Sequence, residues 1–467
     1  MIKMDWKAAA AALQPEYLAD LKKLVAIDSS RDVEHQTDEF PLGPGPAHAL
    51  QQFLAFGERD GFVTKNIDNI VGYIEYGSGS EYFAVLGHAD TVPAGKGWTT
   101  DPFKLEVSGD NLIGRGTSDD KGPALAAYYA LRILKANGIH PMRKIRLVIG
   151  TDEETNWTGM KRYFETQPAP CGGFSPDAEF PLINGEKGNT SFEIKFPQTQ
   201  DSVVPQLKSF QAGLKENMVP RDATAVLTSD EPQTVVKAFN DFLQTVPVTG
   251  SSETESNLIR LAIVGKAAHG MEPKKGLNAG TYLSSFLASQ SLDPVGQKFV
   301  TFIAQKLHDD SRAVKLGLNF TDEVMGDLTM NVGQMQYTND TGGLINTNFR
   351  YPQGVDPNRI AQQLQAATAT ATVRQISNMQ PHFVAIDDPL VESLMEVYRK
   401  QTGRYHDQPE VVGGGTYARL MEHGVAFGAL LPTTTDTMHQ ANEFQPQSDL
   451  LLAMSIYAEA LATVTDK

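Results

Sequence analysis

Residues 81–93 read EYFAVLGHADTVP, an apolar run that ends in two titratable side chains. Segment 83–86 has the composition of a buried strand, and His88 and Asp90 follow it one residue apart. If the strand extends to Asp90, these side chains share a face, because side chains two apart on an extended chain point to the same side. Imidazole is a common metal ligand, and a carboxylate on its other ring nitrogen fixes the tautomer. A pair that only stabilises the strand end is the alternative interpretation.

The size and composition of the chain restrict its fold and its partners. Its 467 residues exceed what one hydrophobic core holds, so two or more domains are expected. The net charge of −16 disfavours nucleic-acid and anionic-membrane partners, which require a basic face. The single cysteine, Cys171, excludes an intrachain disulfide and a cysteine-based zinc site. We recognise neither a signal peptide nor an apolar run of about 18 residues, so we expect a cytoplasmic protein.

Helix and strand signals alternate along the first third of the chain. Apolar residues recur at helical spacing over three segments, 13–27, 48–62 and 121–138. Strand-like segments bounded by turn residues lie at 63–77, 81–90 and 144–154. This alternation predicts an α/β domain.

The pattern changes after residue 186 and returns near residue 383. The intervening segment contains separate strand signals, such as 191–198 and 257–265, without regular βαβ order. We therefore predict a catalytic α/β domain in two pieces, residues 1–186 and 383–467, with a mixed, mostly parallel sheet flanked by helices. An enlarged α+β lid domain, residues 187–382, is predicted to be inserted between them.

Acidic clusters lie where ligands bind in open α/β sheets, at the carboxyl ends of strands. Asp119 and Asp120 stand in a glycine-rich turn before a helix, and Asp177 precedes an apolar segment. Such acids in a loop are often solvated or favour a helix dipole. The run Asp152-Glu153-Glu154 is harder to explain in this way, because three acids next to a buried strand repel one another unless a cation compensates.

Together these residues fit a site for two metal ions. Two histidines, His88 and His439, and three carboxylates suffice for two adjacent divalent ions if one carboxylate bridges them. Such ions can share a water, lower its pKa and polarise a carbonyl. A further carboxylate is then needed as a general base. The pair Glu153-Glu154 supplies one metal ligand and one base.

Six motifs occur in the order found in a known enzyme family: HADTVP, GRGTSDDKG, TDEE, PDAEFP, GKAAHG and MHQANE. On these motifs the chain resembles the co-catalytic zinc peptidase family of aminoacylase, carnosinase and succinyl-diaminopimelate desuccinylase, and most closely its bacterial dipeptidase branch. The resemblance covers nearly the whole chain. It implies two Zn²⁺ ions per chain, although Mn²⁺ or Co²⁺ could fill the same ligands.

The resemblance also implies which residues bind the two ions. It assigns His88 and Asp177 to one ion, and Glu154 and His439 to the other. Asp119 bridges the two ions, and the peptide bond after it is expected to be cis.

Three further residues receive catalytic roles from the resemblance. Glu153 is the general base, which takes a proton from the metal-bridging water and delivers it to the leaving nitrogen. Asp90 does not touch metal and orients His88. His269, in the lid, hydrogen-bonds the oxyanion of the tetrahedral intermediate. A strand-end histidine that is satisfied by backbone groups is the alternative for His269.

Substrate recognition is assigned to the lid and to a glycine-rich segment. Asn217 is expected to face the scissile carbonyl, and Arg350 can bind a carboxylate through two hydrogen bonds. In GGGTYARL, residues 413–420, the glycines lead into an expected helix and form an anion site that includes Gly414, Gly415 and Thr416. Arg350 and the glycine-rich segment are both suited to bind the C-terminal carboxylate of a dipeptide. Asp120 or a nearby acid is a candidate partner for its ammonium group.

The resemblance predicts a di-zinc dipeptidase that cleaves unblocked dipeptides through a water activated by Glu153. An N-acyl amino acid deacylase, of the aminoacylase or desuccinylase type, would use the same metal centre and is the alternative. A metal-binding but inactive relative is a third hypothesis, which the intact Glu153 disfavours. Because the long insertion 187–382 resembles a lid that covers the site within one chain, we expect a monomer.

Overall fold

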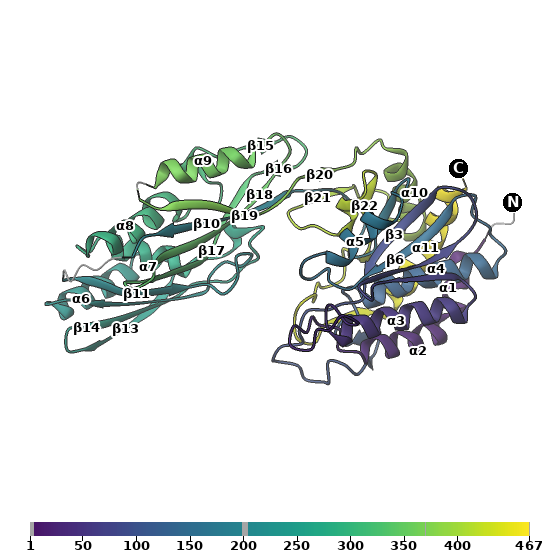
Figure 1. Cartoon of the computed structure of the whole chain (residues 1–467), viewed down its shortest axis with the longest axis horizontal. Coiled ribbons are helices and arrows are strands. Elements are labelled where there is room, and N and C mark those ends of the chain that lie inside the picture. Colours follow the sequence, from purple (N-terminus) through teal and green to yellow (C-terminus); the bar gives the residue numbers. More distant parts are fainter. Residues whose placement is uncertain (1–3, 199–203, 369, 467) are drawn as a thin grey trace. The chain divides into compact units, whose positions relative to one another are not determined.

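The computed structural model describes residues 4–198, 204–368 and 370–466. These residues form two compact units, both drawn in Figure 1. The first unit comprises Met1–Gly185, Phe383–Glu410 and Gly415–Lys467, and the second comprises Glu186–His382 and Val411–Gly414. The first unit is therefore discontinuous in sequence, and the second is inserted into it.

The first unit is built on a mixed sheet that includes seven strands in the order β1-β2-β6-β3-β7-β22-β9. They are β1 (Val63–Ile67), β2 (Val71–Tyr76), β3 (Tyr82–His88), β6 (Lys144–Gly150), β7 (Gly173–Ser175), β9 (Ile183–Glu186) and β22 (Gly424–Ala426). The central strands β6, β3, β7 and β22 pair in parallel. The outer pairings are antiparallel. The sheet is mixed, as expected, with its parallel pairings at the centre.

Helices pack against both faces of this sheet (Figure 1). They are α1 (Trp6–Ala12), α2 (Gln14–Val25), α3 (Pro44–Arg59), α4 (Lys121–Ala136), α5 (Thr158–Thr166), α10 (Pro389–Thr402), α11 (Gln447–Thr465) and the 3-10 helix η4 (Tyr417–Leu420). Val85 of β3 lies in a core cluster with residues of α3, α4 and α11, whereas Ala84 and Leu86 lie in a second cluster with residues of α5. Alternate residues of the strand thus enter opposite faces, and all of β3 is buried.

The helices and strands expected in the first third of the chain are present in the structure. Segments 13–27 and 121–138 contain α2 and α4, and segment 48–62 overlaps α3, which begins earlier, at Pro44. The strand signals coincide with β1, β2, β3 and β6. Short strands complete the unit: β4 (Glu106–Ser108), β5 (Asn111–Ile113), β8 (Ala178–Glu179), β23 (Ala429–Leu430) and β24 (Phe444–Pro446).

Helix α11 has the length and apolar composition of a membrane-spanning segment, in contrast to the expectation that no such apolar run occurs. Of its most apolar window, 72% is buried inside the structure. Leu450, Met454 and Leu461 belong to the main core of the first unit. A buried core helix meets the same criterion, and α11 is such a helix.

The second unit contains an antiparallel sheet in the order β13-β14-β12-β11-β17-β18-β10-β19. Its strands are β10 (Gly188–Phe196), β11 (Gln206–Ala212), β12 (Asp222–Thr228), β13 (Thr249–Glu255), β14 (Leu258–Val264), β17 (Thr329–Thr338), β18 (Gly342–Tyr351) and β19 (Thr372–Met379). The helices α6 (Pro232–Leu243), α7 (Ala279–Ala288), α8 (Pro294–Phe302) and α9 (Pro357–Ala367) pack with it around a separate hydrophobic core.

Several short elements complete the described chain. They are η1 (Pro273–Lys275), η2 (Ile303–Leu307), η3 (Val314–Leu316), β15 (Thr321–Asp322), β16 (Gly326–Asp327), β20 (His382–Phe383) and β21 (Glu410–Val412). Strands β20 and β21 span two of the points at which the chain passes from one unit to the other.

Candidate metal centre

His88 is the last residue of β3, so its imidazole stands at the carboxyl end of a central parallel strand. Its Nδ1 lies 3.0 Å from the backbone carbonyl oxygen of Asp90. A proton on Nδ1 then leaves the lone pair of Nε2 for a ligand. Nε2 is buried and has no hydrogen bond of good geometry to a described residue, although Asp119 Oδ1 lies 3.0 Å and Asp177 Oδ2 3.5 Å away. A buried lone pair held between two carboxylates fits a metal ion.

Asp119 stands between the two predicted histidine ligands. One of its oxygens, Oδ1, is the atom near His88, and Oδ2 lies 2.8 Å from His439 Nε2. His439 Nε2 is also 2.9 Å from Glu154 Oε1. One oxygen toward each histidine is the arrangement that a bridging carboxylate requires. The peptide bond between Asp119 and Asp120 is cis, as the resemblance implied.

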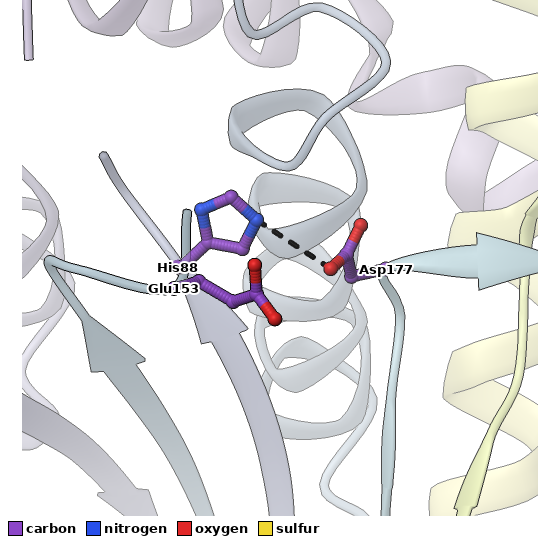
Figure 2. A group of neighbouring side chains, drawn as sticks. All are labelled: His88, Glu153 and Asp177. Atoms are coloured by element: carbon purple, nitrogen blue, oxygen red, sulfur yellow. Dashed lines mark ion pairs between the residues drawn. The ribbon is translucent and has the colours of Figure 1, made fainter. Parts of the chain in front are cut away.

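The ligand atoms form two neighbouring groups. One contains His88, Glu153 and Asp177, and the other contains Asp119, Glu154 and His439, with all atoms of a group within 4.8 Å of one another. Figure 2 shows the His88 ring and the carboxylates of Glu153 and Asp177 converging on one small region. Histidine and carboxylate donors in two adjacent groups suit two divalent ions.

The protonation of these groups reflects burial and crowding of negative charge. Burial, together with the charge of Asp177, raises the pKa of Glu153 well above its usual value. Burial also raises the pKa of Glu154 to about 7. Burial opposes protonation of His439, but its hydrogen bonds to Asp119 and Glu154 prevail and raise its pKa to about 11. Without a cation, protons therefore compensate the charge of the cluster.

Asp90 contacts more than His88. Its Oδ1 lies 3.3 Å from His88 Nδ1, slightly farther than its backbone carbonyl oxygen at 3.0 Å. The same carboxylate also accepts the backbone N–H groups of Glu153 and Glu154, each at 3.1 Å. Asp90 therefore fixes the turn that carries the predicted base and a predicted ligand, a contact that the sequence did not reveal.

The carboxylates of two other acids in the predicted clusters accept hydrogen bonds from backbone N–H groups. Asp152 accepts the N–H groups of Thr158 and Gly159 at the start of α5. Asp120 is fully buried, and its Oδ2 accepts the N–H of His88 at 3.0 Å. The suggestion that Asp120 meets a substrate ammonium group is therefore wrong, because its carboxylate faces the interior beneath β3.

Asn217 and His269 lie on adjacent segments of the second unit. The N–H of Gly270 donates to the carbonyl of Asn217 at 2.7 Å, and Met218 pairs with His269 in an isolated antiparallel bridge. His269 Nδ1 accepts the N–H of Met271 at 3.1 Å. In the neutral ring, Nε2 therefore carries the proton and is the hydrogen-bond donor.

Arg350 also belongs to the second unit and is only 6% exposed. Its Nε donates to Asn348 Oδ1 at 3.0 Å, and its Nη1 donates to the carbonyl of Gly413 at 2.7 Å. A Cβ on Gly413 would come within 2.8 Å of the Cβ of Met271, so this glycine permits a close approach. Arg350 donates to Gly413, and Gly413 lies against Met271. Met271 in turn donates to His269, so these contacts link Arg350 to His269.

The helix expected after the glycines is present only as a short 3-10 helix. Thr416 is followed only by the single 3-10 turn η4, and its hydroxyl accepts the N–H of Ala418. The chain must turn back at Met421 to enter β22, which leaves room for one turn. So short a helix has little dipole, so carboxylate binding at Gly414, Gly415 and Thr416 would rely on individual N–H groups.

Comparison with known proteins identifies the family. The model of peptidase family M20/M25/M40 matches residues 84–463. The chain belongs to this family. The predicted membership of a peptidase family is thus confirmed, and the di-metal arrangement described above lies within the matched part of this M20/M25/M40 peptidase.

Relatives match this peptidase over nearly its whole length. A Staphylococcus saprophyticus protein named "Putative dipeptidase SSP1012" is 42% identical over 462 residues, which is 98% of each chain. A Staphylococcus aureus (strain MW2) protein named "Putative dipeptidase MW1694" is 42% identical over 464 residues, again 98% of each chain.

Solved structures share the fold. Human carnosine dipeptidase 1 has a TM-score of 0.59 at 15% identity and covers 99% of this chain and 98% of its own. Dug1p from Saccharomyces cerevisiae, described as a di-peptidase, has a TM-score of 0.59 at 14% identity with the same coverage.

Proposed function

We propose that this peptidase is a metallodipeptidase that hydrolyses the peptide bond of unblocked dipeptides. The observation that carries the proposal is the position of Asp119, which directs one carboxylate oxygen toward each of His88 and His439. Two relatives of nearly equal length that are named as dipeptidases support the substrate class.

Five side chains would hold two divalent ions. His88 and Asp177 would bind one ion, Glu154 and His439 the other, and Asp119 both. Such ions supply a shared water of lowered pKa and polarisation of the scissile carbonyl. Zn²⁺ suits these donors, and Mn²⁺ or Co²⁺ would fit the same set.

Glu153 would move the proton of the reaction. As the general base it would accept a proton from the attacking water and then deliver it to the leaving nitrogen. Asp90 would keep this carboxylate in place through the backbone N–H of Glu153.

The second unit would contribute substrate contacts. The Nε2–H of His269 would donate to the oxyanion that develops on the scissile carbonyl. Asn217, next to it, would face the same carbonyl. Arg350, with Gly414, Gly415 and Thr416, would bind the C-terminal carboxylate of the dipeptide.

A pair of substrates tests the proposal. Chelator-treated enzyme, with Zn²⁺ added back, is assayed on an Ala-Leu dipeptide and on the same compound with an acetylated amino group. We expect cleavage of the free dipeptide only, and we expect metal to restore it. Preference for the acetylated compound would make the protein an N-acyl amino acid deacylase with the same centre. We further propose a cytoplasmic monomer that acts on small peptides, without nucleic-acid or membrane partners.

A further inference from the structure

Glu443, in the MHQANE motif, is a buried carboxylate that none of the proposed steps uses. Its exposed fraction is 0%. Its Oε1 accepts the backbone N–H groups of Gly116, Ser118 and Asp119 at 3.1, 2.9 and 3.1 Å. Its Oε2 accepts from Arg115 Nη1 at 2.6 Å. All four donors belong to residues 115–119, the segment that ends at the predicted bridging ligand.

Glu443 is also part of the segment that carries His439. It lies four residues after His439 and directly before β24. Strand β24 pairs with β5, which precedes the 115–119 segment. The carbonyl of Glu443 accepts the N–H of Gly114 at 3.0 Å, and Ser118 Oγ donates to Gln445 Oε1 at 3.0 Å. One side chain therefore joins the loop of Asp119 to the loop of His439.

Removal of the Glu443 carboxylate would change the position of Asp119 more than the position of any other predicted metal ligand. Three N–H groups directed at one oxygen form a concave anion site, which the carboxylate fills from within the chain. Charge-assisted hydrogen bonds of this kind are shorter and stronger than neutral ones. One of them is made by the main-chain N–H of Asp119 itself, so this bond sets where the Asp119 side chain begins.

We propose that Glu443 is a positioning residue that holds Asp119 midway between His88 and His439 and so allows both metal sites to fill. This inference rests on the proposed metallopeptidase function. The hydrogen bonds of the Glu443 carboxylate go to residues 115–119, so it would act on the metals through the backbone of Asp119. The binding of Zn²⁺ alone, measured without substrate, therefore reports on it directly.

The test compares Glu443→Gln with a matched control. The amide keeps an acceptor oxygen for the N–H groups but loses the charge and turns an NH₂ group toward Arg115. We expect Zn²⁺ affinity, measured by competition with a chromophoric chelator, to fall about 10–100-fold, as for other residues that orient metal ligands. The KM for the dipeptide at saturating Zn²⁺ should stay unchanged, and excess Zn²⁺ should restore part of kcat.

Glu459→Gln is the control, because Glu459 is another nearly buried carboxylate in the first unit. It pairs with Lys400 and accepts from Gln401 Nε2 at 2.6 Å, within the contacts of α10 and α11. We expect this variant to lose stability but to keep the Zn²⁺ affinity of the wild type. An equal loss of affinity in both variants would overturn the proposal, because it would show a general effect of removing a buried charge.

A second substitution distinguishes an effect on metal binding from a folding defect. Glu443→Asp keeps the charge but shortens the side chain by one methylene, and we expect it also to weaken Zn²⁺ binding. Wild-type affinity in a folded Glu443 variant overturns the proposal, as does failure of both variants to fold, since the carboxylate would then serve the fold. If the wild type binds two ions but cleaves no dipeptide, only the proposed substrate fails.

Discussion

Three consecutive acids, Asp152, Glu153 and Glu154, illustrate how one run of sequence is divided among different tasks. Asp152 bonds to the start of α5, Glu153 lies beside His88 and Asp177, and Glu154 contacts His439. Their side chains leave the end of β6 in different directions, so neighbours in sequence reach different partners. The run of three acids predicted a charged site, but it could not by itself show which acid contacts His439, which lies beside His88 and which bonds to the start of α5.

Replacement of Glu153 by alanine should greatly reduce catalysis without loss of the two metal ions. We expect kcat on a free dipeptide to fall about 10²–10⁴-fold, the usual contribution of a general base. Two Zn²⁺ ions should still bind, as measured by elemental analysis of the dialysed protein. Glu154→Ala is the comparison and should lose metal as well as activity. Full hydrolysis by a Glu153→Ala variant that holds two ions would refute the role of Glu153.

Metal binding should release protons. In the metal-free protein, the carboxylates around His88 and His439 raise the pKa of both rings, that of His439 to about 11. The His439 ring is therefore protonated at pH 7.5 and must lose a proton to bind metal. Zn²⁺ affinity should rise with pH and level off only as the pH passes these raised values. Calorimetric titrations in buffers of different ionisation enthalpy should show a net release of protons, whereas heats independent of the buffer would contradict this.

Among the secondary-structure elements, those with local signals were predictable and those set by distant contacts were not. Helix α4 and strand β3 follow from their own apolar patterns; the predicted ligand His88 ends β3, and the predicted ligand Asp119 lies just before α4. Glu443 meets its partners more than 320 residues away in sequence, a pairing that no local pattern encodes. The length of η4 is set by the return of the chain into β22, which is also a tertiary constraint.

The start of α5 offers a prediction about a single element. Asp152→Ala leaves the N–H groups of Thr158 and Gly159 without their acceptor. We expect the free energy of unfolding of the metal-loaded protein to fall by about 1–2 kcal/mol in urea denaturation, as for lost helix caps. Asp152→Asn, which keeps one acceptor oxygen, should lose less. Metal content of two ions should be unchanged in both, and loss of an ion would show that Asp152 supports the metal site instead.

For the whole molecule, we expect a monomer, because one chain supplies all the residues of the proposed mechanism. All six predicted metal-centre residues belong to the first unit, and the second unit has its own sheet, its own core and both Asn217 and His269. One chain thus carries every residue of the proposed mechanism. We expect size-exclusion chromatography with light scattering to give the mass of a single chain, 50.9 kDa, at all protein concentrations. A mass near twice 50.9 kDa, about 102 kDa, would show that a dimer forms and that the second unit also serves association.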